Sequence, residues 1–432
     1  MKKIFLLILG FSLMSSRAFA GAQDVNIDIS RFESRKVNIA IADFQNNVAG
    51  MDEDWGAQAA AIIKNDLVLS GYFNIIENGN DRALQADNLD FAELSGQGID
   101  AIAKGSIAIQ DDKILLDCYL YDTASKARVA GIRYKASLSI FRKSIHNFSD
   151  EIIYRYTGSA GIAHSRICFV GDLKGLREVY AVDYDGYNFQ AITREKSLVI
   201  LPRWSPDGGR IIYTSYRDGN PDLYCISSDG SGRRMICGYQ GLNTTGRYSP
   251  DGKYIAVTLS KDGNPDLYLL NGNGELLRRL TNSRSIDSSP SWSPGSQDIV
   301  FVSDRSGTPQ LYVIDIEGLN LRRLTYTNGY NDSPDWSPTG DRIAYVARMQ
   351  NEFNIFTTDV NGSYQQQLTK GSGRNENPSW SPDGRFIVFI SNRNGKSQLY
   401  VMNNDGSNQR PLFPGELSDQ FKGEIYTPDW SR

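Results

Sequence analysis

The feature that most restricts the fold of this chain is a repeat of about 44 residues that fills its C-terminal two thirds. Each unit opens with an aromatic residue and Ser, continues with hydrophobic strands and an acid-Gly or Asn-Gly turn, and tends to close with Leu-Thr. The aromatic anchors are Trp204, Tyr248, Trp292, Trp336, Trp380 and Trp430. A period of about 40–50 residues with several strands per unit predicts the blades of a β-propeller.

Six hairpin turns predict six blades. They are Asp185-Gly186, Asp229-Gly230, Asn273-Gly274, Glu317-Gly318, Asn361-Gly362 and Asp405-Gly406. The first repeat begins at Arg166 without a preceding aromatic-Ser-Pro strand, whereas the last repeat is followed by an isolated strand that contains Trp430. We therefore expect the C-terminal strand to become the innermost strand of the first blade and to close the ring.

The residues ahead of the repeats predict a mixed α/β domain. Residues 37–42 have the pattern of a strand, residues 55–67 carry apolar side chains at helical spacing, and three further strands are predicted within residues 99–136. A last helix is predicted from Leu138, with Gly158 as its C-terminal cap. The predicted fold class is an α/β N-terminal domain followed by an all-β six-bladed β-propeller that the C-terminal strand closes.

The predicted boundaries divide the chain into five parts. They are a signal peptide over residues 1–20, a mobile segment over 21–32, the α/β domain over 33–157, a linker over 158–163 and the propeller over 164–432. The signal peptide is indicated by Lys2 and Lys3, a short apolar run, and the cleavage pattern at residues 18–20. We therefore expect the mature protein to be exported.

Charge argues against nucleic acid as a partner. The chain has 46 basic and 50 acidic residues, and loss of Lys2, Lys3 and Arg17 with the signal peptide leaves 43 basic ones, a net charge of about −7. A protein that binds nucleic acid usually presents a basic surface instead.

The segment over residues 21–32 has the period of a β-strand. Val25, Ile27 and Ile29 alternate with polar residues, so one side of an extended segment is apolar. Such a segment either pairs with the sheet edge of another protein or is simply a mobile terminus. The sequence leaves both interpretations open.

The four cysteines are predicted to be buried thiols. Cys118, Cys168, Cys225 and Cys237 are isolated, and most of them stand in predicted strands, where cysteine behaves as a small hydrophobic residue. Cys225 and Cys237 flank one hairpin, so a disulfide between them is the alternative in an oxidising compartment. The sequence contains no Cys-x-x-Cys motif, so it gives no support to metal or thioredoxin chemistry.

The sequence gives little support to an enzyme. A peptidase with this kind of propeller needs a hydrolase domain and a Gly-x-Ser-x-Gly motif, which the chain lacks. His146 and His164 are the only histidines, so neither a Ser-His-Asp triad nor a multi-histidine metal centre is predicted. No catalytic residue is therefore assigned, and the alternative is a hydrolase or lyase that acts through channel carboxylates.

Several motifs resemble those of the TolB family of the bacterial Tol-Pal system. They include Ala103-Lys-Gly105-Ser, Leu120-Tyr-Asp122, Asp150-Glu151-Ile152 after His146, Thr157-Gly158-x-x-Gly161-Ile162, and the repeated Ser-Pro-Asp-Gly and Arg-Arg-Leu-Thr sequences. The resemblance covers essentially the whole mature chain. Tyr248 in place of Trp and the turn at residues 271–274 depart from the family pattern, and both changes are structural.

The resemblance implies a non-enzymatic periplasmic hub. Family members bind the lipoprotein Pal on the propeller and the inner-membrane protein TolA through the mature N-terminus, and some colicins use the same propeller surface. The resemblance also implies a role in outer-membrane integrity and in constriction during cell division. It matches Val25, Ile27 and Ile29 to the TolA-binding stretch. We expect a monomer that reaches membranes only through its partners.

Polar loops between the blades are the predicted Pal-binding surface. In a propeller these loops surround one mouth of the central channel, and as a ring they form a concave polar surface suited to a protein loop or tail. Solvation of ordinary turns is the alternative interpretation for any single residue. The predicted contact residues are Asn243, Thr244, Asp287, Ser288, Asp332, Ser333, Asn375 and Asn377.

Charged residues directly before the aromatic anchors should approach the channel. Asp429 and Arg203 would lie on adjacent blades, where an ion pair is the simplest expectation. Alternatively, Asp335 and Asp429 could hold a Ca²⁺ ion together with carbonyl groups and water. The sequence contains no spaced calcium-binding motif in support of such a site. No other cofactor is predicted.

Overall fold

The computed structural model describes most of the chain after its N-terminal segment. The described ranges are 35–47, 54–77, 84–85, 88–110, 113–327, 329–413 and 421–432. The predicted signal peptide and the segment with Val25, Ile27 and Ile29 lie outside them. None of the helices within these ranges is long and apolar enough to cross a membrane. Val37–Arg432 forms one compact unit, which contains the α/β domain and the propeller.

The α/β domain is built on a six-stranded sheet with the strand order β3, β1, β4, β5, β6, and β2 pairs with β4 outside this path. The strands are β1 (Val37–Ile41), β2 (Gln45–Asn46), β3 (Phe73–Ile75), β4 (Ala101–Gln110), β5 (Lys113–Asp122) and β6 (Ala127–Ser137). β3, β1 and β4 are parallel, whereas β4, β5 and β6 are antiparallel. The helix between β1 and β3 provides the crossover that parallel neighbours require.

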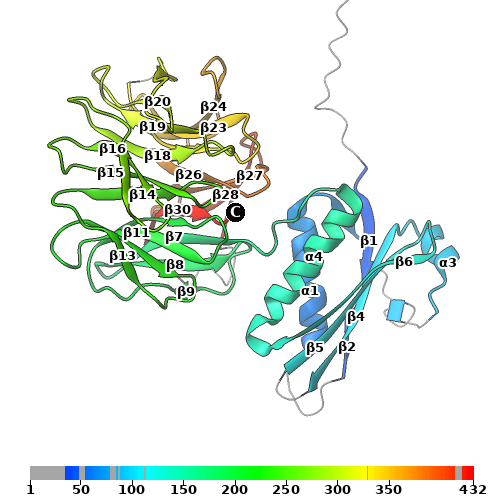
Figure 1. Cartoon of the computed structure of the whole chain (residues 1–432). Helices are drawn as coiled ribbons and strands as arrows, with labels where there is room; N and C mark the ends of the chain where they lie inside the picture. The colour runs from blue at the N-terminus through cyan, green and yellow to red at the C-terminus, as the bar shows by residue number, and fades with distance from the viewer. Residues whose placement is uncertain are drawn as a thin grey trace, which may run out of the picture. The chain divides into compact units, whose positions relative to one another are not determined.

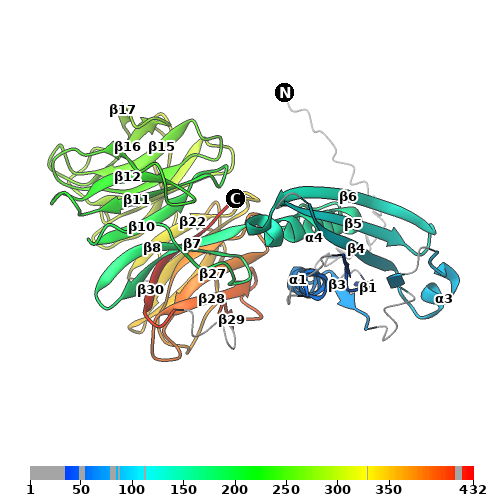
Figure 2. The ribbon, with the colours of Figure 1, turned by 90° about the horizontal axis from the view of Figure 1, so that it is seen from below.

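Two long helices pack against this sheet. They are α1 (Trp55–Ser70) and α4 (Phe141–Thr157), and a single 3₁₀ turn, η2 (Leu138–Ile140), leads into α4. Figures 1 and 2 show α1 and α4 beside each other, and both contribute to one apolar core with the sheet strands. The short helix α3 (Phe91–Gly96) precedes β4.

The helix boundaries follow from local chemistry. The Asp54 side chain accepts a hydrogen bond of 3.0 Å from the backbone N–H of Ala57, which satisfies one free donor at the start of α1. α1 and α4 end at Gly71 and Gly158, which have φ angles of 76° and 72°. A left-handed residue at this position favours glycine, because glycine has no Cβ.

The propeller consists of six four-stranded sheets, as the six hairpins predicted. The first three, ordered from the innermost strand outwards, are β30 (Glu424–Trp430), β7 (Arg166–Leu173), β8 (Leu176–Asp183) and β9 (Gln190–Ala191); β10 (Val199–Trp204), β11 (Arg210–Ser215), β12 (Asp222–Ser227) and β13 (Arg234–Cys237); and β14 (Asn243–Tyr248), β15 (Tyr254–Leu259), β16 (Asp266–Asn271) and β17 (Leu276–Arg279).

The other three blades repeat the same order. They are β18 (Asp287–Trp292), β19 (Asp298–Ser303), β20 (Gln310–Asp315) and β21 (Arg322–Arg323); β22 (Asn331–Trp336), β23 (Arg342–Met349), β24 (Glu352–Asp359) and β25 (Gln365–Gln367); and β26 (Asn375–Trp380), β27 (Phe386–Ser391), β28 (Gln398–Asn403) and β29 (Arg410–Pro411). The second and third strands of each blade are buried on both faces, because the neighbouring blades cover them. Their sequences are therefore nearly continuous apolar runs.

The C-terminal strand closes the ring, as predicted. β30 pairs antiparallel with β7, so Trp430 lies opposite Ile167 (Figure 1). The backbone N–H of Arg166 donates to Ser431 Oγ at 2.8 Å, and the backbone N–H of Ser431 donates to the carbonyl of Arg166 at 2.8 Å. The first blade is therefore assembled from two segments that are far apart in the sequence.

The cysteines are buried, as expected for structural thiols. Cys118, Cys168, Cys225 and Cys237 are all free. Burial raises the pKa of Cys237 to about 12. Strand pairing places Leu223 opposite Cys237 and Cys225 opposite Arg234, so Cys225 and Cys237 are not cross-strand neighbours. This register explains why the alternative of a bridge between them is not realised.

Candidate functional site

The central channel of the propeller is lined by the six innermost strands. These strands contact one another around the ring, and their anchor residues are linked from blade to blade by hydrogen bonds at one level. Their first residues therefore gather at one end of the channel and their anchors at the other. We call the two residues that stand four and three positions before each anchor the mouth. We call the anchors and the residues directly before them the floor.

The mouth is partly accessible in every blade. Its twelve residues are all half-buried: Ile200, Leu201, Thr244, Thr245, Ser288, Ser289, Asp332, Ser333, Glu376, Asn377, Tyr426 and Thr427. Most of them are polar. Five of the residues predicted to contact Pal belong to this ring: Thr244, Ser288, Asp332, Ser333 and Asn377. The structure therefore brings these five together around one opening.

The other three predicted contact residues have a different environment. Asn243, Asp287 and Asn375 are the first residues of their strands, and each is 0% exposed. Each of these side chains is already hydrogen-bonded within the propeller, and its contact with Pal stays a prediction.

These hydrogen bonds fix the loops between the blades. Asn243 accepts from the backbone N–H of Tyr239 at 2.8 Å and donates to its carbonyl at 2.6 Å. Asp287 forms an ion pair of 2.8 Å with Arg305. Asn375 donates to the carbonyl of Gly373 at 3.0 Å and accepts from Arg393 at 3.1 Å. Buried polar groups need such partners, so these three residues hold the mouth in shape.

A left-handed residue stands three positions before the anchor in every innermost strand. The φ angles are 56° at Leu201, 53° at Thr245, 55° at Ser289, 51° at Ser333, 53° at Asn377 and 44° at Thr427. The pairing of each innermost strand with its neighbour shifts register at this point, which marks a β-bulge. None of these residues is glycine, and such a conformation costs a non-glycine residue about 1–2 kcal/mol.

The sequence-based selection missed part of this ring. Thr245, Ser289, Glu376 and Thr427 stand in the mouth but were not selected. The position of the mouth could have been recognised from the residue that follows each bulge, which is Pro in five blades and Gly246 in the sixth. A repeated proline inside a strand indicates a bulge or an edge.

The floor links neighbouring blades through side-chain hydrogen bonds. The backbone N–H of Trp204 donates to Asp429 Oδ2 at 2.7 Å, and that of Trp380 donates to Asp335 Oδ2 at 2.8 Å. Ser291 and Ser379 accept in the same way from Trp336 at 3.0 Å and from Trp430 at 3.1 Å. The residue before one anchor thus binds the next anchor around the ring, which holds the blades together.

The floor also contains a compact group of buried charges. Arg203 lies 3.8 Å from Asp429, which confirms the expected ion pair. Arg247 forms an ion pair with Asp335 and lies 3.7 Å from Asp429. Burial raises the pKa of Asp429 although Arg203 and Arg247 oppose this shift. Burial lowers the pKa of Arg247, but the charges of Asp335 and Asp429 outweigh that effect, so its pKa is raised.

The two floor carboxylates do not fit a Ca²⁺ site in this arrangement. Calcium requires six to eight oxygen ligands. Here the Arg247 guanidinium group lies between Asp335 and Asp429, and backbone N–H groups occupy the second oxygens of both carboxylates. These carboxylates therefore act as partners of arginine and of the anchors.

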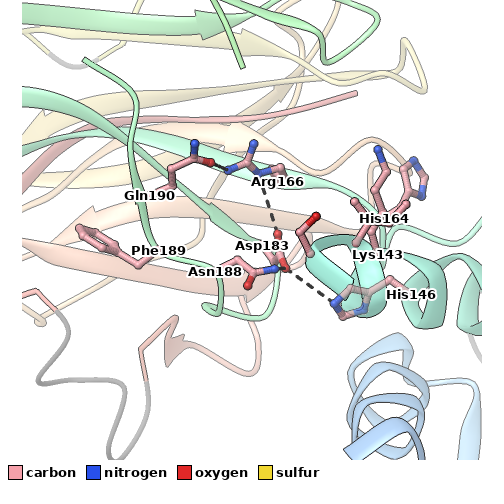
Figure 3. Close-up of a pocket in the computed structure, with 10 residues that line it drawn as sticks. Lys143, His146, His164, Arg166, Asp183, Asn188, Phe189 and Gln190 are labelled. Carbon is pink, nitrogen blue, oxygen red and sulfur yellow. Dashed lines mark hydrogen bonds and ion pairs between the residues drawn. The ribbon is translucent and has the colours of Figure 1, made fainter. Parts of the chain in front are cut away.

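Both histidines line a cavity of about 470 Å³ at the junction of α4 with the first blade (Figure 3). His146 Nδ1 lies 2.8 Å from Asp66 Oδ2, and His164 Nδ1 lies 2.6 Å from Asp150 Oδ2. His146 is buried, whereas the His164 side chain is 47% exposed. Each imidazole is thus paired with a carboxylate of the α/β domain.

The fold and the mouth together define a class of protein, namely a six-bladed β-propeller with an attached α/β domain and a polar ring at one channel opening. Residues 154–432 match the family model of the TolB beta propeller domain, and residues 25–129 match that of the TolB amino-terminal domain. The chain therefore belongs to the TolB family, as the motif resemblance predicted.

Similar proteins carry the name Tol-Pal system protein TolB. One from Desulfosudis oleivorans is 36% identical over 207 residues, which are 46% of this chain and 47% of that protein. One from Geobacter sulfurreducens is 35% identical over 211 residues, 48% of this chain and 49% of that protein. The chain thus spans about half the length of these curated relatives.

A solved structure extends the similarity over nearly the whole fold. The crystal structure of TolB from Acinetobacter baumannii is 26% identical and has a TM-score of 0.75, and the match covers 92% of this chain and 97% of that one. The α/β domain and the propeller therefore occur together in a solved member of the family.

Proposed function

We propose that this chain is a non-enzymatic periplasmic docking protein of the Tol-Pal system, which binds Pal at the mouth of its propeller and TolA through residues 21–32. In this role it supports outer-membrane integrity and constriction during cell division, and colicins can use the same mouth. The observation that carries the proposal is the ring of half-buried polar residues around one channel opening.

The geometry of the mouth supports a protein ligand. Buried first residues such as Asn243, Asp287 and Asn375 fix the backbone of the mouth. Binding of a partner therefore costs little conformational entropy in this backbone. The mouth side chains are half-buried and most of them are polar, so they offer hydrogen-bonding groups at the opening. Across neighbouring blades, Ser333 donates to Asn377 at 3.3 Å, so the ring is continuous there.

The proposed TolA site rests on the sequence pattern and the family resemblance. Val25, Ile27 and Ile29 would supply apolar side chains on one side of an added strand, while the backbone pairs with a sheet edge of TolA. The two proposed sites are therefore chemically different, since one is a folded polar ring and the other an extended segment.

A binding experiment with two variants tests both sites. The mouth variant carries Thr244→Ala, Ser288→Ala, Asp332→Ala and Asn377→Ala, and the second variant lacks residues 21–32. We expect the mouth variant to bind purified Pal at least about tenfold more weakly, which corresponds to about 1.4 kcal/mol. We expect the deletion to abolish TolA binding and to leave the folded propeller intact.

The control for the mouth variant changes the outer edge of the propeller. Arg322→Ala and Gln366→Ala lie on the outermost strands β21 and β25, and they should leave Pal affinity unchanged. Thermal unfolding of all variants shows whether they fold. Undiminished Pal binding by a folded mouth variant, or an equal loss in the outer-edge control, would refute the mouth as the Pal site. Normal TolA binding after the deletion would refute the second site.

A further inference from the structure

His146 is a buried histidine at the place where the α/β domain meets the propeller. It stands on α4, and its side chain is 1% exposed. Helix α1 contributes Asp66 to its surroundings, and the turn after β8 of the first blade contributes Tyr184 and Asp185. The imidazole therefore touches both domains.

One side of the imidazole is held by a carboxylate that both domains share. His146 Nδ1 lies 2.8 Å from Asp66 Oδ2, while the hydroxyl of Tyr184 donates to Asp66 Oδ1 at 2.9 Å. The ring of Tyr184 also packs edge-on against the imidazole, with the ring centres 6.0 Å apart. Asp66 thus connects α4 of one domain to the first blade of the other.

The other side of the imidazole faces charges from both domains. His146 Nε2 lies 3.9 Å from Asp183 Oδ2 and 3.4 Å from Arg142 Nη2, and the dashed line in Figure 3 marks the contact with Asp183. Arg142 forms an ion pair of 2.6 Å with Asp185, and Arg166 lies 3.9 Å from Asp183.

The charges of this cluster balance only when His146 is protonated. The carboxylates are Asp66, Asp183 and Asp185, and the permanent cations are Arg142 and Arg166. An imidazolium ion at His146 supplies the third positive charge, whereas a neutral imidazole leaves one buried carboxylate in excess. Uncompensated buried charge is strongly unfavourable.

We propose that this cluster is a proton-dependent latch between the α/β domain and the propeller. With His146 protonated, Nδ1–H binds Asp66, Nε2–H faces Asp183, and the two domains are held together. Loss of the Nε2 proton to solvent removes the attraction to Asp183 and leaves the carboxylates of the junction in excess, so the contact between the domains weakens. The latch does not depend on where Pal or TolA binds.

The electrostatic environment agrees with this geometry. Burial and the positive charge of Arg142 lower the pKa of His146, but the hydrogen bond with Asp66 and the charges of Asp66 and Asp185 outweigh them, so the pKa is raised. The stabilising effect is therefore fully present below the ordinary histidine pKa of about 6.5 and is lost as the pH rises through the higher pKa of the folded protein.

The chain offers a matched control for the latch. His164 also lies at the junction and pairs with Asp150, but its side chain is 47% exposed. Asp150 stands on α4, the helix that leads into the segment with His164. Because the chain contains only two histidines, each gives one resolvable imidazole signal in an NMR spectrum of histidine-labelled protein. The variant His164→Gln assigns the remaining signal to His146.

The first experiment follows the His146 signal as a function of pH in the full chain. We expect a titration midpoint above about 6.5 in the His164→Gln protein. We also expect Asp66→Asn to lower this midpoint, because burial then acts without the carboxylate that opposes it. A His146 midpoint at or below about 6.5 would overturn the latch.

The second experiment measures the opening of the junction. Residues 158–160 between the domains are exposed, so elastase cleavage after Ala160 reports on access to this segment. We expect cleavage of the native chain to become several-fold faster as the pH rises through the His146 midpoint. His146→Gln should remove this increase, whereas His164→Gln should retain it. The same pH dependence in His146→Gln as in the native chain, or its loss only in His164→Gln, would overturn the proposal. If His146→Gln does not fold, the NMR midpoint alone decides.

Discussion

The floor and the mouth of the channel are formed by the same six strands, only a few residues apart, yet their side chains make different kinds of contact. At the floor, side chains such as Asp335 and Asp429 bind the backbone of the next blade and cannot change without leaving buried groups unpaired. At the mouth, the backbone is constrained by the bulges, while the side chains are half-buried and bond to other side chains, as Thr244 does with Thr214 and Asp332 with Tyr330.

The difference shows how a propeller can keep one fold and still change its ligand. Stability depends on the inter-blade bonds of the floor and on the buried first residues, including Asn243 and Asp287. In the proposed function, Pal is recognised by residues between these two levels, whose backbone is fixed from both sides. Substitutions at the mouth should therefore alter binding more than stability, and those at the floor should do the reverse.

The largest effect is expected when the floor loses a whole strand. Deletion of residues 425–432 removes Trp430 and the pairing of β30 with β7, and it opens the ring. Truncation of a buried aromatic side chain alone costs about 3–5 kcal/mol, a large part of the roughly 5–15 kcal/mol of an ordinary domain. The propeller should therefore fail to unfold cooperatively in calorimetry.

Deletion of Arg432 alone is the matched control for that truncation. Its guanidinium group makes one hydrogen bond, of 3.4 Å, to the carbonyl of Trp336 and interacts with the charges of Asp335 and Asp429, but β30 stays intact, so its loss should cost much less than loss of the strand. An unchanged unfolding curve for the longer deletion would show that β30 does not close the ring.

A smaller effect is expected from a single floor carboxylate. Asp335→Ala leaves Arg247 with only the more distant carboxylate of Asp429, at 3.7 Å, and the backbone N–H of Trp380 without an acceptor. Breaking a buried pair from one side costs about 3–5 kcal/mol, measurable by urea unfolding. The double variant Arg247→Met/Asp335→Leu should cost less than the sum of the single changes. Strict additivity would mean that the two residues are not coupled.

The smallest effect is expected at a mouth bulge. Ser289 has a φ of 55°, so Ser289→Gly should relieve the left-handed conformation and change stability by no more than about 1 kcal/mol, in the stabilising direction. Ser289→Val should destabilise by about 1–2 kcal/mol, because β-branched residues tolerate this conformation poorly. If both variants had equal stability, the bulge would not constrain the backbone at the mouth.

The sequence was sufficient to predict most of the fold, because its main determinants are local and repeated. The period of the aromatic anchors indicated the propeller, the hairpins gave the number of blades, and the isolated strand with Trp430 predicted the closure. The prediction missed β2 (Gln45–Asn46) and α3 (Phe91–Gly96), since elements of two and six residues show too few positions for a periodic pattern.

The candidate site was only partly predictable. The sequence indicated which loops surround the channel, but Asn243, Asp287 and Asn375 look like any polar turn residue until their buried partners are seen. The floor pair of Arg247 and Asp335 joins residues 88 positions apart, and the junction pair of His146 and Asp66 joins residues 80 positions apart. Sequence periodicity carries no information on such distant pairs.

The two-segment first blade has a consequence for the order of folding. The contact between Arg166 and Ser431 spans 265 positions, so the first blade cannot be completed until the last residues of the chain are available. The other five blades consist of consecutive strands and can form early through local contacts. During folding, the chain should therefore carry an open five-bladed arc with an unpaired edge at β7, and a chaperone or protease that recognises such edges would act only until β30 pairs with β7.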